Sequence, residues 1–139
     1  MAADDNKRLI IRYFETVDGG DQERTLRLVD EIVAEDYVAY WAGATYRGRD
    51  ALKSHIAAAY QTFGEMRHQI EDNLAEGDTV VTRVTFRAVL KGDFLGIPAI
   101  GKRIECPIIY ITRLSEGRFR EVWLDWDSLF TVADQLRSS

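Results

Sequence analysis

The chain has 139 residues, of which 46% are hydrophobic and 29% are charged, a composition typical of a folded globular protein. Its formal net charge of −5 argues against a general attraction to nucleic acid, and no apolar run approaches the roughly 20 residues that cross a bilayer. The sequence therefore predicts one domain over residues 1–139 that acts on a small molecule or on another protein.

The amino-terminal segment lacks the basic region and apolar stretch of a signal peptide, which predicts a cytoplasmic location. Cys106 is the only cysteine, so neither an internal disulfide nor a cysteine-based metal cluster can form within one chain. The two histidines, His55 and His68, stand too far apart to indicate a metal site by spacing. We therefore predict no metal.

Three helices are predicted in the first half of the chain, where apolar residues recur at intervals of three and four. The first covers residues 5–17 and ends before Gly19 and Gly20, because glycine readily adopts the conformations that end helices. The second covers residues 22–33, and the third runs from near Asp50 to near Gly64.

The second half alternates with period two and is rich in Val, Thr and Phe, which indicates strands. The predicted strands, including one in the first half, are 37–41, 68–74, 79–91, 103–114 and 119–126, followed by a short helix at 128–136. A turn is expected between Gly43 and Gly48, and a loop at residues 92–98. This order predicts an α+β fold, with three amino-terminal helices packed on a curved antiparallel sheet that encloses a pocket.

The last predicted strand carries the most informative residues of the chain. Because side chains of a strand alternate between faces, Trp123, Asp125 and Asp127 are expected on one face. Val122, Leu124 and Trp126 are expected on the other. A carboxylate beside indole rings is a candidate acid–base group, because desolvation raises the pKa of a carboxyl.

Two segments carry a resemblance to a known family. The order of the elements, with residues 46–52 opening the third helix, resembles the NTF2-like α+β cone. The stretch Gly-Asp-Phe-Leu-Gly-Ile-Pro-Ala-Ile-Gly-Lys-Arg at 92–103 is similar to a loop of SnoaL-like polyketide cyclases. The carboxyl-terminal residues that also match are Glu121, Trp123, Asp127, Leu129, Gln135 and Leu136.

The resemblance implies a conical pocket, a homodimer or higher assembly through the sheet, and no metal or organic cofactor. It also implies intramolecular aldol closure of a polyketide ester, with an aspartate on the last strand and an assisting histidine on the preceding strand. When Asp127 is aligned with the second aspartate of the family, the catalytic aspartate position falls on Leu124 and the histidine position on Tyr110. A bulge, which re-aims side chains, would be needed to turn Asp125 inward.

Asp125 and Tyr110 are the catalytic candidates. Asp125 could remove a proton alpha to a carbonyl, or it could be a strand residue that faces solvent. Tyr110 could donate a hydrogen bond to a developing enolate oxygen, or it could be a core tyrosine. Asp127 is interpreted as a helix cap.

The expected substrate contacts come from aromatic residues and their neighbours, because pockets for flat ligands are lined mainly by such side chains. His55 lies beside an apolar helical stripe, where it could also relay protons, whereas His68 is expected to be exposed. Arg83 and Arg87 are expected on the outer face of the sheet. The predicted substrate contacts are Tyr13, Trp41, His55, Phe94, Trp123, Leu124 and Trp126.

Three functions follow as hypotheses. The first is a cofactor-independent cyclase or isomerase that acts on a small, apolar, oxygenated substrate. The second is a protein that binds a small molecule without changing it, with Asp125 facing water. The third, hydrolysis of an epoxide, needs an inward-facing Arg83 paired with an acid, and Thr85 stands where a second acid would be expected.

Overall fold

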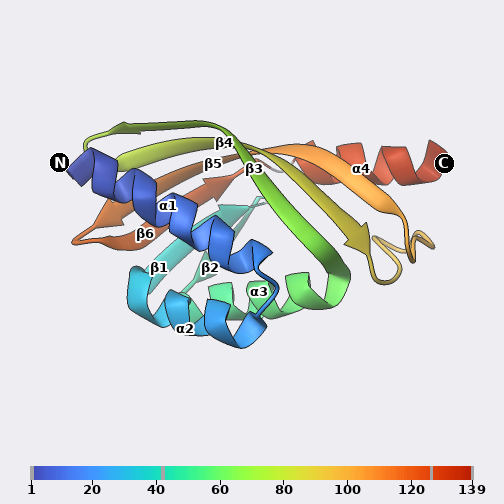
Figure 1. Cartoon of the computed structure of the whole chain (residues 1–139), viewed down its shortest axis with the longest axis horizontal. Helices are drawn as coiled ribbons and strands as arrows, with labels where there is room; N and C mark the ends of the chain where they lie inside the picture. Colours follow the sequence, from blue (N-terminus) through green and yellow to red (C-terminus); the bar gives the residue numbers. More distant parts are fainter. Residues whose placement is uncertain (1, 42, 126, 139) are drawn as a thin grey trace.

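A curved sheet covered by helices on its concave side forms the structure, a computed structural model (Figure 1). It describes residues 2–41, 43–125 and 127–138, with the backbone alone for residues 2 and 127–130. The helices are α1 (Ala2–Asp18), α2 (Gln22–Ile32), α3 (Arg49–Thr62) and α4 (Asp127–Ser138). The strands are β1 (Val33–Trp41), β2 (Ala44–Arg47), β3 (Phe63–Glu76), β4 (Thr79–Leu90), β5 (Arg103–Ser115) and β6 (Arg118–Leu124).

The described strands form one sheet in the order β2-β1-β6-β5-β4-β3. The predicted α+β cone is thereby confirmed, but β1 runs parallel to β6, whereas only antiparallel neighbours were expected. Sequence periodicity does not report which strands pair, and this pair joins segments about eighty residues apart. The expected turn at 43–48 contains β2, which pairs with β1; its side chains are exposed except Tyr46 and so lack an apolar alternation.

The helix boundaries follow from local chemistry. The α1 helix ends at Asp18, and Gly20 follows at φ 81°, a conformation that glycine adopts without strain. The α2 helix begins after Asp21, whose side chain accepts a hydrogen bond from the Arg24 backbone N–H at 3.0 Å. At the end of α3, the chain passes directly into β3 at Phe63.

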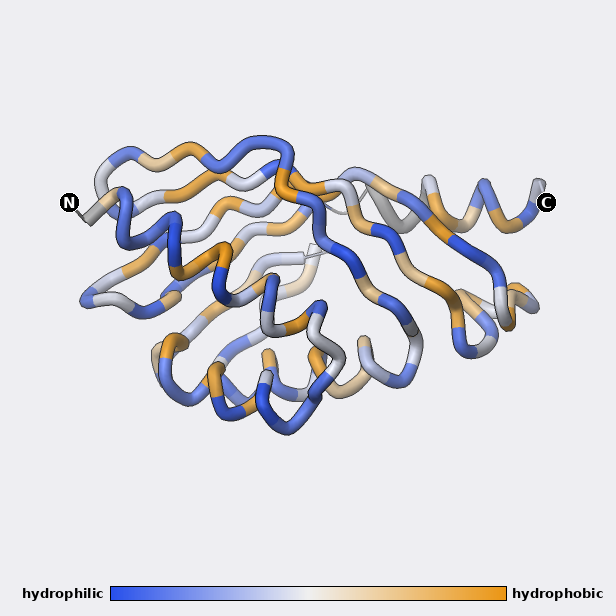
Figure 2. The backbone as a smooth tube through the Cα atoms, in the orientation of Figure 1, coloured by the Kyte–Doolittle hydropathy of each residue, from blue (hydrophilic) through white to orange (hydrophobic). Residues whose placement is uncertain are grey.

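Strand β3 starts five residues earlier than the sequence predicts. Its pairing with β4 shifts register between Gly64 and Arg67, and Glu65 has φ 51°. This irregularity interrupts the period-two pattern, so the first part of the strand was not recognised. By contrast, buried residues of β4 alternate with exposed or half-buried ones along most of its length, as the sequence predicts. Figure 2 shows hydrophobic and hydrophilic segments following one another along the strands of the sheet.

The sheet separates an apolar concave face from a charged convex face. Val80, Val84 and Leu90 of β4 are buried on the concave side. Arg83 and Arg87 lie exposed on the other side, as expected, and pair with Asp72 and Glu105. In the described part of the chain, no helix combines the length and the hydropathy that a membrane crossing requires.

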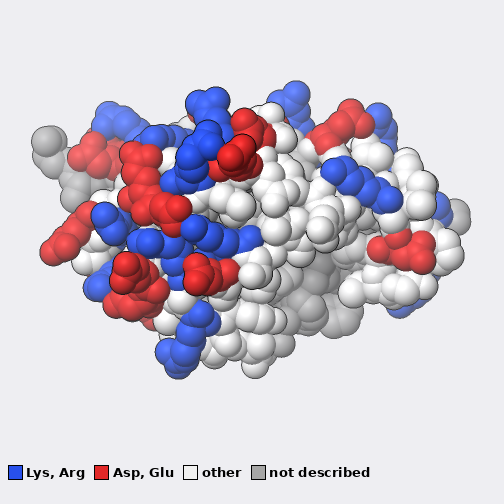
Figure 3. Space-filling model, turned by 90° about the horizontal axis from the view of Figure 1, so that it is seen from below, with Lys and Arg blue, Asp and Glu red and all other residues white. Residues whose placement is uncertain are grey.

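Charged side chains are also unevenly distributed on the helical side of the molecule. Seen from below, Lys, Arg, Asp and Glu gather over one half, and uncharged side chains dominate the middle (Figure 3). Ion pairs between the helices include Arg12 with Glu31 and Lys53 with Asp30. Such pairs near the surface contribute little to stability.

Candidate active site

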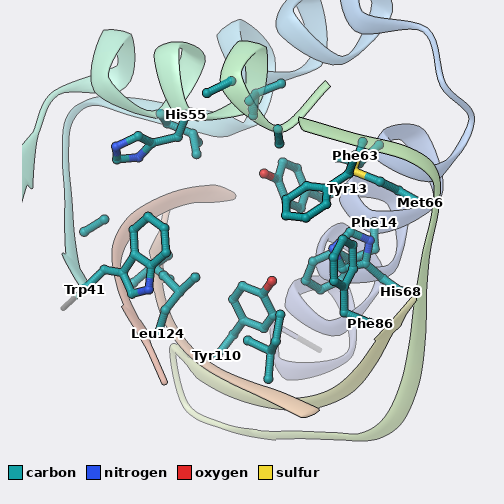
Figure 4. Close-up of a pocket in the computed structure, with 18 of the residues that line it drawn as sticks. Tyr13, Phe14, Trp41, His55, Phe63, Met66, His68, Phe86, Tyr110 and Leu124 are labelled. Carbon is teal, nitrogen blue, oxygen red and sulfur yellow. The ribbon is translucent and has the colours of Figure 1, made fainter. Parts of the chain in front are cut away.

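A cavity of about 430 Å³ lies between the concave face of the sheet and helices α1 and α3. This volume lies within the range of about 300–1,000 Å³ that small-molecule sites occupy. The walls are mainly aromatic and aliphatic (Figure 4), with a few polar groups contributed by tyrosines, two threonines, two histidines and one aspartate. The cavity therefore suits a flat, largely apolar ligand with a few oxygen atoms.

Tyr110 of β5 lines the cavity, and its hydroxyl group points into it opposite the hydroxyl group of Tyr13 (Figure 4). Tyr37 lines the same space. Among the described residues, the hydroxyl groups of these three tyrosines form no hydrogen bond with protein atoms, and no unpartnered polar atom is buried. The three hydroxyl groups therefore face accessible space in the cavity and can donate to a ligand.

These tyrosines are strongly desolvated. Burial, with a smaller contribution from Tyr13, Cys106, Tyr37 and Asp18, raises the pKa of Tyr110 well above its ordinary value of 10.0. Burial likewise raises the pKa of Tyr13 and of Tyr37. Each of the three remains a neutral hydrogen-bond donor at physiological pH, which is the state that stabilises charge on a ligand oxygen.

Leu124 and Asp125 both line the cavity. Leu124 is the last residue of β6 and pairs with Tyr110 of β5. The next residue, Asp125, donates its backbone N–H to the Ile109 oxygen at 3.1 Å. Trp123 and Leu124 face opposite sides of the sheet, as strand alternation requires. Because β6 ends at Leu124, this alternation does not extend to Asp125, and two successive residues line the same cavity.

The surroundings of Cys106 give a second indication of where Asp125 lies. Burial, followed by the carboxylates of Asp125 and Glu105, raises the pKa of the buried Cys106 thiol to about 11. Cys106 belongs to the cavity wall. The Asp125 carboxylate therefore lies near the part of the cavity wall that Cys106 forms.

Trp41 and His55 form one end of the cavity, together with Tyr46. The His55 ring packs edge-on against Trp41 at 5.8 Å and against Tyr46 at 4.6 Å between centroids. Burial lowers the pKa of His55 below its ordinary value of 6.5. The His55 ring is therefore uncharged at pH 7 and packs between two aromatic side chains.

Phe94 closes another part of the wall from the loop between β4 and β5. Its backbone forms two hydrogen bonds of 2.9 Å with Ile97, and its ring lies 6.2 Å from that of Phe63. Phe94 is buried, whereas its neighbour Leu95 is 61% exposed and also lines the cavity. The loop similar to that of SnoaL-like cyclases thus contributes an apolar wall.

One of the predicted contacts, Trp123, lies outside the cavity. Trp123 stacks on Tyr40 at 5.1 Å and lies under the Arg113 guanidinium, and it is not among the described lining residues. Strand alternation explains this position, because Val122 and Leu124 on either side of Trp123 face the cavity. Trp126 lies outside the described residues, and so does the side chain of Asp127, the predicted helix cap.

His68 lines the cavity, so the expectation that it is exposed is wrong. Its ring Nδ1 lies 2.6 Å from Oδ1 of Asp18, and its backbone N–H donates to Oδ2 of the same carboxylate at 2.6 Å. The ring stacks on Phe14, with centroids 4.6 Å apart and an interplanar angle of 22°. The structure thus brings a carboxylate–histidine pair to the cavity.

The described residues include no group of three or more His, Cys, Asp or Glu side chains arranged to hold a metal ion. Arg83 pairs with Asp72 on the convex face, with 53% of its side chain exposed. The epoxide-hydrolase hypothesis requires Arg83 to point into the cavity, whereas the structure places this side chain on the opposite face of the sheet.

Comparison with known proteins agrees with this geometry. The sequence pattern of the family described as SnoaL-like polyketide cyclase matches residues 9–136. The chain belongs to this family. No curated protein matches the sequence significantly.

Three solved structures illustrate the similarity. A candidate SnoaL-like polyketide cyclase from Jannaschia sp. CCS1 is 20% identical, with a TM-score of 0.86 over 99% of this chain and 94% of that one. TsrD from Streptomyces laurentii is 26% identical, with a TM-score of 0.80 over 97% and 96%. IdmH from Streptomyces antibioticus, named a candidate polyketide cyclase, is 25% identical, with a TM-score of 0.79 over 95% and 98%.

The resemblance to SnoaL-like cyclases implies two catalytic positions, and the residues expected there can be located in the structure. Under the alignment that places Asp127 on the second aspartate of the family, the catalytic aspartate position is expected at Leu124 and the histidine position at Tyr110; both residues line the cavity. Acidic and basic groups reach the cavity from other positions instead, through Asp125 and through His68. The Asp18–His68 pair was missed because its two members are fifty residues apart, and no local spacing signals such a contact.

Proposed function

We propose that this protein is a cofactor-independent cyclase that closes a ring by acid–base catalysis on a small, apolar, oxygenated substrate. The observation that carries this proposal is one apolar cavity lined by both Tyr110 and Asp125. Membership of the SnoaL-like polyketide cyclase family supports a cyclase-type role. The assignment of these two residues to the reaction is our proposal.

In the proposed reaction, Asp125 removes a proton from a carbon next to a carbonyl group. The C–H bond breaks, and its electron pair forms an enolate whose oxygen accepts a hydrogen bond from the Tyr110 hydroxyl. The enolate carbon then attacks a second carbonyl carbon of the same molecule, and a C–C bond forms. No electrons enter or leave the substrate, so the reaction needs no redox cofactor.

The apolar wall supports this chemistry in two ways. It excludes water from the enolate, which strengthens the hydrogen bond from Tyr110. It also folds a flexible substrate so that its two reacting carbons approach each other, which lowers the entropic part of the barrier. Tyr13, Trp41, His55, Phe94 and Leu124 are the proposed substrate contacts, and all five line the cavity.

Binding without chemistry is the second candidate function, and the largely apolar wall favours it. That hypothesis expects Asp125 to face water, whereas Asp125 is among the lining residues. The two functions differ in turnover rather than in binding. A protein that only binds would take up the same ligands and leave them unchanged.

We also propose that the protein forms a homodimer through the convex face of the sheet. Ile109 and Ile111 of β5 are 41% and 38% exposed there, and Val81 of β4 is 37% exposed. Val81 pairs with Ile111 in the β4–β5 register, so two of these side chains are neighbours. An apolar patch within an otherwise charged face is the kind of surface that a second copy covers.

The proposed activity is tested with 1-phenylhexane-1,5-dione, whose methyl ketone carbon can attack the aryl ketone to close a six-membered ring. The purified protein is mixed with this diketone, and ring-closed products are separated by chromatography against a protein-free control. We expect saturable acceleration of ring closure. Saturable binding without acceleration would instead establish the binding function.

A further inference from the structure

Asp18 and His68 form a geometrically constrained pair at the edge of the cavity. One carboxylate oxygen contacts the ring Nδ1 and the other accepts the backbone N–H of the same residue, both at 2.6 Å. Only 8% of the His68 side chain and 13% of the Asp18 side chain are exposed. Two bonds from one carboxylate to one residue fix the orientation of the ring.

The position of Asp18 is unfavourable for helix stability alone. Asp18 is the last residue of α1, where the helix dipole is negative, and the last turn of α1 contains no basic residue. A carboxylate at this end of a helix is destabilising, and burying it adds a desolvation cost. The bonds to His68 offset part of this cost. Helix stability therefore does not explain the buried Asp18–His68 pair, which is consistent with a role in the cavity.

The second ring nitrogen of His68 remains available. Within the described residues, Nε2 forms no hydrogen bond, and no unpartnered polar side-chain atom is buried. Nε2 therefore retains contact with accessible space, and His68 lines the cavity. Phe14 and Phe86 pack on the ring at 4.6 and 4.8 Å between centroids, which prevents the ring from turning away.

The location of His68 differs from that of the proposed base. In Figure 4, Tyr110 lies between Leu124 on one side and His68 with Phe14 and Phe86 on the other. Asp125 follows Leu124 in the chain, and Tyr110 packs against Phe14 at 5.1 Å. The proposed enolate donor thus lies between His68 and Leu124, the residue that precedes Asp125.

Ring closure by aldol addition has two proton transfers at two different atoms. A carbon loses a proton before the C–C bond forms, and the oxygen of the second carbonyl gains one afterwards. The carbon and the oxygen lie on different parts of the folded substrate, so one fixed side chain reaches both with difficulty. A second proton-transfer group at the cavity would overcome this problem.

We propose that His68, oriented by Asp18, is the acid that protonates the alkoxide oxygen formed when the ring closes. This assignment rests on the proposed cyclase function and adds a catalytic residue to it. Asp18 is a positioning residue: its carboxylate binds Nδ1–H, directs Nε2 toward the cavity, and compensates the positive charge of the protonated ring.

The protons balance in this scheme. The imidazolium Nε2–H bond breaks, its electron pair stays on nitrogen, and the proton forms the hydroxyl group of the ring product. After the product leaves, water enters the cavity and carries the proton that Asp125 took from carbon to His68, which restores both groups. Histidine suits this step because Nε2 can carry the proton while Nδ1 stays bound to Asp18.

The test separates the two proton transfers in D₂O with the same diketone. Exchange of hydrogens next to the methyl ketone, measured by NMR, needs only the base and the enolate donor; ring closure also needs the acid. We expect His68→Gln to keep exchange within about threefold of wild type and to slow ring closure by at least about 100-fold.

Asp18→Asn provides a second variant that leaves the His68 ring in place. We expect it to slow ring closure by roughly 10–100-fold, the range found for groups that orient metal-bound histidines, and again to spare exchange. Asp36→Asn is the control, because Asp36 is exposed and pairs with Arg120 away from the cavity. Thermal unfolding checks that each variant is folded.

Three results would overturn the proposal. Unchanged ring closure in His68→Gln would remove His68 from the reaction. Equal loss of exchange and closure would make His68 a base or a structural residue rather than the acid. Wild-type protein that neither exchanges nor closes the diketone would overturn the proposed function, and the assignment of His68 with it.

Discussion

Tyr110 of β5 lies opposite Leu124 of β6 in the antiparallel register, and both side chains line the cavity. This pairing fixes the end of the last strand relative to the proposed enolate donor. Because β6 ends at Leu124, the following residue is released from strict alternation, and Asp125 also reaches the cavity wall. The proposed base and the proposed donor therefore occupy adjoining strands.

Removal of the Tyr110 hydroxyl tests the donor. We expect Tyr110→Phe to slow both hydrogen exchange and ring closure of the diketone by about 10²–10³-fold, the cost of losing one oxyanion donor. Tyr40→Phe is the matched control, because the Tyr40 hydroxyl donates to Glu121, and Tyr40 is not among the described lining residues. Equal rates for wild type and Tyr110→Phe would remove this hydroxyl from the reaction.

The desolvated tyrosines predict a loss of stability in alkali. In the folded state the pKa of Tyr13, Tyr37 and Tyr110 is raised above 10.0. The unfolded chain therefore loses these protons first as pH rises above 10.0. The stabilisation is complete below that pH, and the free energy of unfolding should fall above it.

Urea unfolding at several pH values between 9 and 12 measures this effect. Each tyrosine that stays neutral only in the folded state contributes up to about 1.4 kcal/mol per pH unit to the slope. Tyr110→Phe should make the decline shallower by up to that amount, whereas Tyr40→Phe serves as the comparison. An identical slope in wild type and Tyr110→Phe would show that Tyr110 ionises in the folded protein.

His55 should titrate at low pH. Burial lowers the pKa of His55 in the folded state, so the neutral ring is favoured by folding. Its contribution to stability is present above the ordinary value of 6.5 and is lost as pH falls through the lowered value. NMR titration of the ring should give a pKa below 6.5. A midpoint at or above 6.5 would contradict the packing of His55 between Trp41 and Tyr46.

The proposed homodimer predicts a monomeric variant. We expect Ile111→Lys to shift the protein from dimer to monomer in light scattering, because a charge would be placed in the apolar patch. Ile100→Lys is the control, since Ile100 is 75% exposed on the loop between β4 and β5. A wild-type monomer, or a dimer that persists in Ile111→Lys, would exclude this face as the interface.

Local patterns in the sequence were sufficient for most of the fold. Apolar spacing located the three amino-terminal helices, and alternation located β4, β5 and β6, because both reflect contacts with one continuous core. The parallel pairing of β1 with β6 and the small strand β2 were not predicted. Pairing between distant segments leaves no periodic trace, and the four residues of β2 are too few and too exposed to show one.

The site was predictable in part for the same reason. Tyr13, Trp41, His55, Phe94, Tyr110 and Leu124 were placed from the resemblance and the apolar stripes, and all line the cavity. Trp123 was also expected to contact the substrate. Strand alternation instead turns its side chain away from the cavity, and it stacks on Tyr40. The contact between Asp18 and His68 depends on how α1 crosses β3, which no local pattern specifies.

The central claim, that Asp125 is the base of a cyclase, is tested most directly by the rate of ring closure in Asp125→Asn beside Asp36→Asn. Asparagine keeps the size of the side chain but cannot accept the proton. We expect Asp125→Asn to lose both hydrogen exchange and ring closure by about 10²–10⁴-fold, whereas Asp36→Asn retains both. Ring closure by Asp125→Asn at the wild-type rate would show that Asp125 is not the base.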